Sequence, residues 1–137
     1  MSLSNYLENK LLTHVFGGTS YVPPASVYVG LFTSSPTDGN IGTEVSGTGY
    51  SRQSVSMTVA GTTPTQASSS SDIEFAQAAS DWGLVTHIGL LDDSTSGNLL
   101  AWSEITDPND DQAALPRNIL NGDVLIILAG NLKVRLD

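Results

Sequence analysis

The sequence predicts an all-β protein, an antiparallel β-sandwich of jelly-roll or Ig-like type with a short N-terminal α-helix. Three observations support this prediction. Short alternating apolar runs, separated by turn-forming residues about every eight to twelve positions, recur along most of the chain. Charged residues make up only 14% of the chain, and Ser, Thr, Gly and Asn replace them, as is common in β-rich proteins. Apolar residues at helical spacing stand out at the N-terminus.

The 137 residues have the size of one domain, and 39% of them are hydrophobic, which suffices for one core. We expect residues 1–18 to form a helix that packs on the domain or docks to a neighbour, and residues 19–137 to form a single β-sandwich domain. The formal net charge of −9 disfavours nucleic acid and anionic membranes as partners, because both attract Lys and Arg. The chain has no cysteine and no apolar run long enough for membrane insertion.

The N-terminal segment carries a candidate subunit-docking stripe. Leu3, Leu7, Leu11 and Val15 recur every four residues, which places them on one face of a helix. A helix of about four turns is too short to be stable alone, so this stripe must pack on something. It either covers one end of the domain or docks onto a neighbouring subunit, and the sequence leaves both open.

Both ends of this segment carry residues typical of helix termini. Asn5 followed by Glu8 predicts a capping box, and Ser2 and Ser4 are other N-cap candidates. Gly17-Gly18 is expected to end the helix.

The rest of the chain reads as strands. Residues 26–32 are apolar on both faces, which predicts a central strand, and residues 50–59 alternate like a half-buried one. Further strands are expected at residues 73–75, 85–91, 99–105, 124–128 and 131–136. The turn-forming stretch at residues 94–98 predicts a hairpin between two of them.

Three polar stretches are expected to be loops. Residues 34–46 contain the turn signal Asp38-Gly39, residues 61–71 are rich in Ser and Thr, and residues 107–116 begin with an acidic run. Recognition often resides on loops over a rigid scaffold, so these three loops are the candidate contacts if the protein binds a partner.

Candidate catalytic residues are few. His14 lies in the helix and His87 in an apolar strand, and the chain offers neither a cysteine nor a G-x-S-x-G motif for them to act with. We interpret His87 as a hydrogen-bonded strand histidine and expect no enzyme activity. Gly47-Thr48-Gly49 resembles the start of a dinucleotide fingerprint, but the third glycine and the crossover helix are missing. No cofactor is therefore expected.

Calcium is the metal ion that the sequence comes nearest to accommodating. Asp107, Asn109 and Asp111 have the spacing of the first half of an EF-hand loop. Gln112 stands where such a loop needs glycine, and Asn118 where it needs a bidentate Glu. A solvated acidic turn without metal is the better interpretation.

Two tryptophans are the remaining candidates for ligand binding. Trp82 and Trp102 could together form a carbohydrate-stacking platform. Each lies beside strand-like sequence, however, so packing in the core or between sheets is the favoured interpretation.

Four stretches cover most of the chain in a distinctive order: SLSNYLENKLLTHVFGG, YVGLFTSSPTDGNIGTEVSGTGYSRQ, SDWGLVTHIGL and AGNLKVRLD. In this order and spacing they resemble small virion structural proteins of tailed phages, usually described as tail-fibre proteins. The resemblance implies a place in the virion, on the tail or the capsid surface, and brings no catalytic residues.

A tail-fibre or tail-associated role is the favoured implication of this resemblance. The alternatives are a capsid decoration protein and a host-surface (glycan) recognition module. The implied partners are other phage virion proteins and further copies of the chain, with a trimer favoured because trimers are usual for such proteins. A host-surface receptor is the further candidate partner.

Overall fold

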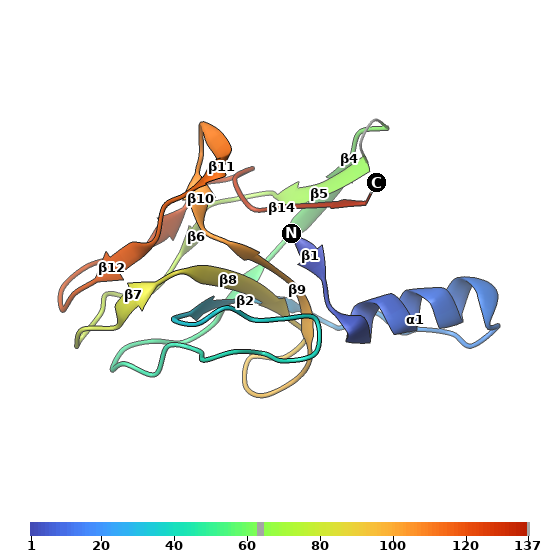
Figure 1. Ribbon diagram of the computed structural model, residues 1–137, viewed down its shortest axis with the longest axis horizontal. Helices are drawn as coiled ribbons and strands as arrows, with labels where there is room; N and C mark the ends of the chain where they lie inside the picture. The colour runs from blue at the N-terminus through green and yellow to red at the C-terminus, as the bar shows by residue number, and fades with distance from the viewer. Residues whose placement is uncertain (63–64, 137) are drawn as a thin grey trace.

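The computed structural model describes residues 1–62 and 65–136, and these residues form fourteen strands and one α-helix (Figure 1). In chain order the elements are β1 (Ser2–Leu3), α1 (Asn5–Phe16), β2 (Val27–Phe32), β3 (Gln53–Val55), β4 (Met57–Ala60), β5 (Thr65–Ser69), β6 (Ile73–Glu74), β7 (Gly83–Val85), β8 (His87–Leu91), β9 (Leu99–Glu104), β10 (Thr106–Asp107), β11 (Asp110–Ala114), β12 (Arg117–Ile119), β13 (Ile126–Ile127) and β14 (Lys133–Leu136).

A five-stranded sheet in the order β1-β9-β8-β2-β3 is the centre of the molecule. A three-stranded sheet, β14-β5-β4, and the pairs β12-β7 and β13-β6 contribute apolar side chains that pack against it. The main core lies between these layers, and all pairings between strands of the described residues are antiparallel. The prediction of an all-β, sandwich-like fold with one short N-terminal helix is thereby confirmed.

The central strand β2 is covered on both faces, as its apolar sequence predicted. Val29 and Leu31 point into the main core, whereas Phe32 belongs to a second buried cluster with Leu91 and Leu99. The loop after β2 closes over this second cluster, because Thr33 N–H donates to Thr43 O and Val45 N–H donates to Leu31 O.

Two glycines make room for the Phe32 ring against the sheet. Gly30 on β2 and Gly89 on β8 lie directly opposite each other. A Cβ atom on Gly89 would lie 2.8 Å from Phe32 Cε2, and one on Gly30 would lie 2.9 Å from Leu91 Cδ1. Real Cβ atoms essentially never approach this closely, so the second cluster needs both glycines.

Two predicted strands each divide between two sheets. The strand expected over residues 50–59 becomes β3, which pairs with β2, and β4, which pairs with β5. The strand expected over residues 85–91 becomes the end of β7, which pairs with β12, and β8. Ser56 and Thr86 lie at the two corners, where a strand that bends can change sheets. Continuous alternation in the sequence does not show such a bend.

Two predicted loops contain strands. Within residues 61–71, of which 63–64 lie outside the described part, Thr65–Ser69 forms β5, the middle strand between β4 and β14. Within residues 107–116, Asp110–Ala114 forms β11 and pairs with β10. Arg117–Ile119 forms β12, which no sequence pattern indicated. Backbone hydrogen bonding places these polar segments in sheets, and their composition does not reveal it.

Candidate functional site

Residues 2–4, which we call the root of α1, are anchored in the central sheet. Ser2 and Leu3 pair with Trp102 and Ala101 of β9. Ser4 is 2% exposed; its N–H donates to Leu100 O (2.9 Å) and its hydroxyl to Leu99 O. The same hydroxyl accepts the Leu7 N–H at 3.2 Å and is the N-cap of the helix, so the expected Asn5–Glu8 capping box is wrong and the Ser4 alternative is confirmed.

Beyond its root, α1 points away from the sandwich, and the chain returns beside it to β2 (Figure 1). The helix ends with Gly17 N–H donating to Thr13 O at 2.9 Å. On the return path, Tyr21 N–H donates to His14 Nδ1 at 3.1 Å. We call residues 5–22, the helix together with this return segment, the arm.

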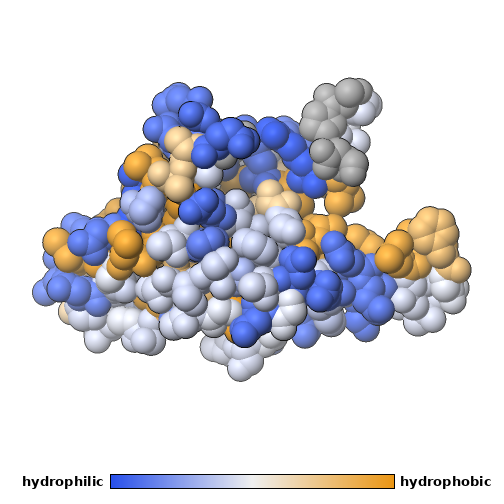
Figure 2. Space-filling view, in the orientation of Figure 1, coloured by the Kyte–Doolittle hydropathy of each residue, from blue (hydrophilic) through white to orange (hydrophobic). Residues whose placement is uncertain are grey.

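The end of the arm presents apolar side chains to solvent. Leu12, Val15 and Phe16 lie at i, i+3 and i+4 on one helical face, and Phe16 is 82% exposed. We call these three residues the apolar tip; they belong to the orange area at the far end of the helix in Figure 2. Val22 of the return segment is also largely exposed.

The predicted docking stripe does not form one surface. Leu3 lies in β1, so its assignment to the helix is wrong, because the start of the chain pairs with β9. Leu3 and Leu7 pack against the protein's own core, Leu11 is half-buried, and Val15 is exposed. The sequence leaves open whether the stripe packs on the domain or docks onto a neighbour. In the structure its first half packs on the domain, and its last residue is exposed to solvent. Docking through Val15 stays a prediction.

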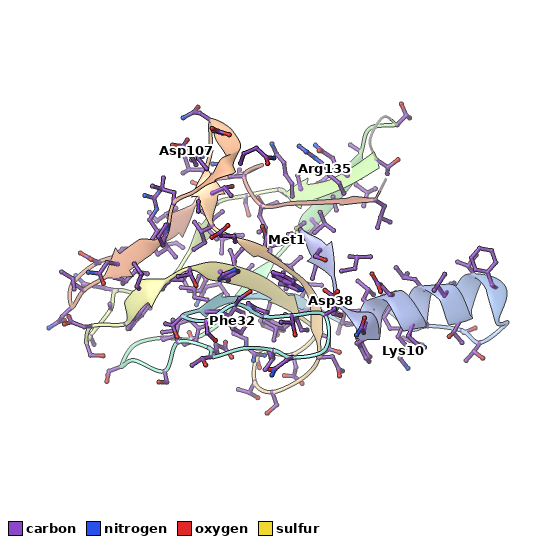
Figure 3. All side chains as sticks on the ribbon, in the orientation of Figure 1. Met1, Lys10, Phe32, Asp38, Asp107 and Arg135 are labelled. Atoms are coloured by element: carbon purple, nitrogen blue, oxygen red, sulfur yellow. The ribbon has the colours of Figure 1, made fainter. Side chains whose placement is uncertain are left out.

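A cleft of about 420 Å³ opens on another side of the molecule, lined by segments far apart in the sequence. Leu31, Ile88 and Leu132, all buried, form its floor, and the more exposed Ile126 and Leu128 lie at its mouth. Figure 3 labels three lining residues, Asp107 on the β10–β11 hairpin, Arg135 on β14 and Met1 just before β1. No single stretch of sequence carries this cleft.

The cleft collects basic residues in an acidic chain. Arg117, Lys133 and Arg135 line it, which is three of the five Lys and Arg residues present. Two acids, Glu104 and Asp107, also line it. Arg135 Nε donates to Gln66 Oε1 at 3.2 Å, which holds that side chain over the β5–β14 pair.

A second polar group, Glu44, Tyr50 and Arg52, ties the β2–β3 loop to the β8–β9 loop. Arg52 donates through Nε and Nη2 to the two carboxylate oxygens of Glu44, at 2.8 Å each, and through Nη1 to the carbonyls of Asp93 and Ser96 at 2.7 Å. Tyr50 donates to Glu44 Oε1 at 2.7 Å and accepts the Leu31 N–H at 2.9 Å.

The pKa values of this group follow from these contacts. Burial by itself would raise the pKa of Glu44, but hydrogen bonds from Arg52 and Tyr50 outweigh it and hold that pKa below the ordinary value. Burial raises the pKa of the Tyr50 hydroxyl well above its ordinary value. The hydrogen bonds to Glu44 raise the pKa of Arg52. All three side chains bind each other or the backbone, as expected of structural groups.

The two histidines and the two tryptophans lie at separate places. His87 on β8 shares a 2.8 Å hydrogen bond with Thr86 through Nδ1, which confirms its interpretation as a hydrogen-bonded strand histidine, and burial lowers its pKa. Trp82 is 5% exposed and stands edge-on to Tyr50, with a ring separation of 5.4 Å. Trp102 donates to Asp38 Oδ1 at 3.1 Å. Core packing of Trp82 is thereby confirmed, so it cannot share a stacking platform with Trp102.

The Gly47-Thr48-Gly49 turn packs on Trp82. A Cβ atom on Gly47 would lie 2.3 Å from Trp82 Cδ1, and Trp82 Nε1 donates to Thr48 O at 3.1 Å. Gly49 has φ +88°, which favours glycine. These glycines therefore serve a tight turn over an aromatic ring.

The calcium candidate lies at the β10–β11 turn. Asp107 Oδ1 accepts the backbone N–H of Asn109 at 2.8 Å and its amide at 3.3 Å, which makes an Asx turn. The side chain of Asp111, the third candidate ligand, lies outside the described part. The hairpin itself explains the Asp107 and Asn109 pattern.

Comparison with known proteins identifies the family. Among the described residues, no helix is long and apolar enough to cross a membrane. No curated protein matches the chain. The family model of podophage GP4 fiber I protein gp80 matches residues 2–135. This match confirms the tail-fibre prediction and favours it over capsid decoration. Because the match spans nearly the whole chain, the protein belongs to this fibre family and is a structural component of the phage virion tail.

Proposed function

We propose that this chain is a non-catalytic assembly unit of the fibre, that it forms a homotrimer, and that the arm makes its principal contact with neighbouring virion subunits. Membership of the fibre family implies association with other virion proteins. The exposed apolar tip of the arm supports the proposal that this association takes place there. The trimer follows from the resemblance to tail-fibre proteins.

The observation that carries this proposal is the contrast between the two ends of α1. Its root is fixed by β1 pairing and by the buried Ser4, so the direction of the helix is set by the central sheet. Its apolar tip has no partner of comparable size in the described chain, and Phe16 is 82% exposed. Exposed apolar groups on a rigidly held element are typical of interaction surfaces.

A non-catalytic role is supported by what the titratable groups do. Burial and their mutual hydrogen bonds shift the pKa values of Glu44, Tyr50 and Arg52, and these three side chains hold two loops together. Perturbed pKa values arise in structural ion-pair networks as well as in active sites, and this network has the structural geometry.

The test compares virions that carry Phe16→Asp with virions that carry Val59→Asp. Val59 is 70% exposed on β4 and lies outside the arm, which makes it a matched control. We expect purified particles of the Phe16→Asp phage to contain at least about tenfold less fibre chain by mass spectrometry. Normal incorporation of Phe16→Asp would overturn the proposal that the arm makes the principal contact.

The mass of the purified chain in solution tests the trimer. Light scattering should give three times the 14.3 kDa chain mass. Another stoichiometry would overturn the proposal of a trimer. The role of the arm would still be decided by the virion experiment.

Contact with a host-surface receptor is a second candidate function. The β4–β5 and β10–β11 hairpins both project on the side of the body opposite the loop after β2 (Figure 1). Two projecting hairpins on a rigid body suit recognition. The purified chain should bind host cells, and Asn109→Pro in the second hairpin should weaken that binding; equal binding by both chains would remove this hairpin as the contact.

A further inference from the structure

We infer that the basic cleft receives the apolar tip of a second copy of this chain. This inference rests on the proposed function and deepens it by naming the partner and its receiving surface. Each copy would offer a tip on one side and a cleft on another.

The cleft and the tip match in kind. The cleft exposes both polar and apolar groups; its exposed apolar side chains include Ile126 and Leu128, 47% and 57% exposed, and the buried Leu31 and Ile88 lie behind them. Its volume of about 420 Å³ lies in the range, roughly 300–1,000 Å³, of cavities that enclose a bound group. The Phe16 ring and its two aliphatic neighbours form a convex apolar group at the end of a rigid rod. Apolar side chains exposed on both surfaces would leave water together.

Charge favours this pairing over other contacts between copies. Two chains with a net charge of −9 repel each other, so they associate best where the local charge is positive. Three basic residues, Arg117, Lys133 and Arg135, line the cleft against two acidic ones, Glu104 and Asp107, so its lining has a net charge of about +1 in a chain of net charge −9. The C-terminal end of a helix carries about half a negative charge from its aligned peptide dipoles. The tip lies at that end of α1, so it would bring a complementary charge to the cleft.

A copy cannot fill its own cleft with its own tip. Met1 lines the cleft, and the chain runs from there through β1 to the buried Ser4, where α1 begins. The tip then lies about 18 Å further along a 12-residue helix that points away from the sandwich (Figure 1). Contact between the two different surfaces is therefore head-to-tail between copies. Such contacts close into rings when the rotation permits, and a ring of three would match the proposed trimer.

Complementation between two purified full-length variants tests this inference. Phe16→Asp removes the tip and keeps the cleft, whereas Leu128→Asp blocks the cleft and keeps the tip. Both positions are exposed, so both chains should fold, which thermal unfolding would verify. By analytical ultracentrifugation the wild type should self-associate, and each variant alone should do so at least about tenfold more weakly. An equimolar mixture should form a heterodimer, because one intact tip then meets one intact cleft.

Several results would overturn the inference. They are a wild type that stays monomeric, a Leu128→Asp chain that associates like the wild type, and a mixture that contains only monomers. Lys133→Glu should also weaken association of the wild-type tip and cleft. The Val59→Asp chain is the matched control and should associate normally.

The virion experiment separates failure of this inference from failure of the proposed function. If Phe16→Asp blocks incorporation while Leu128→Asp does not, the arm docks onto a different virion protein, so the second-copy inference fails and the proposed function stands. If neither variant reduces incorporation, the proposed function fails as well. If both reduce it and the mixture gives heterodimers, both stand.

Discussion

Phe32 and Phe16 are the same amino acid in two regions that treat it oppositely. Phe32 is 0% exposed, packed with Leu91 and Leu99 on the central sheet above two facing glycines. Phe16 is 82% exposed at the end of the arm. None of the residues of α1 is buried, whereas four consecutive residues of β2 are. The Phe32 cluster is thus closed within a single chain, whereas the arm, like the mouth of the cleft, exposes apolar side chains that a partner would cover.

Matched truncations should give the largest difference between the two regions. We expect Phe32→Ala to lower the free energy of unfolding by about 3–5 kcal/mol, because it leaves a cavity in a closed cluster. Phe16→Ala should change the free energy of unfolding of the monomer by less than about 0.5 kcal/mol. Urea denaturation measures both, and equal losses would show that the tip is buried in the monomer.

Cutting the polar network should have the next largest effect. Arg52→Ala would remove the ion-pair partner of the partly buried Glu44 carboxylate, which would keep only the Tyr50 hydroxyl as a donor, and would leave two loop carbonyls without the guanidinium. We expect the free energy of unfolding to fall by about 2–3 kcal/mol. In the arm, Lys10→Ala removes a cation that lies 5.5 Å from the centre of the half-buried Tyr6 ring, and it should cost less than about 1 kcal/mol. A larger loss of unfolding free energy for Lys10→Ala than for Arg52→Ala would contradict the contrast between the body and the arm.

Adding a methyl group to a glycine of the body should lower the free energy of unfolding only where the surrounding side chains leave no space for it. Gly89→Ala would force Phe32 and Leu99 to move, and we expect a loss of about 1–3 kcal/mol in the free energy of unfolding. Gly39→Ala is the matched control, because its nearest neighbour would lie 3.7 Å from the new Cβ. Similar melting temperatures for both variants would mean that the Phe32 cluster can relax.

The pH dependence of stability should show the smallest of these effects. The pKa of Glu44 is lowered by folding, so its contribution is complete above the unfolded value of 4.5 and is lost as the pH falls through the lower folded pKa. The pKa of His87 is also lowered, so its contribution is complete above 6.5 and shrinks below it. Glu44→Gln should therefore flatten the fall in stability below pH 4.5 and leave the fall near pH 6 unchanged. An unchanged acid limb would show that other carboxylates dominate it.

Sequence patterns predicted the elements whose burial is visible in their own residues. They failed for elements that depend on pairing with strands far away in the sequence. The apolar run at residues 26–32 indicated a central strand, and β2 is one. The Ser- and Thr-rich stretch that contains β5 was expected to be a loop. That prediction failed because β5 is held between β4, its neighbour in the chain, and β14, which is more than sixty residues away. The helix was expected from its spacing, but its first leucine pairs with β9 instead.

The two surfaces of the proposed contact differ in the same way. The position of Val15 on one face of a helix could be predicted from the sequence, because helical spacing is a local property. The cleft was not, because its lining joins β9, β10, β12, β13 and β14 with Met1. Arg117 and Lys133 are sixteen positions apart and lie on different sheets, so only their three-dimensional placement shows that they share a basic rim.

By itself, the sequence determined the all-β class, the terminal helix, the burial of Trp82 and the place of the chain among phage fibre proteins. These follow from periodicity, composition and motif order, which act over short stretches or over the chain as a whole. Only the tertiary structure decided where strands change sheets, which half of the leucine stripe is free, and that three basic side chains meet over an apolar floor. Each of these depends on contacts between residues distant in sequence, and no local pattern records them.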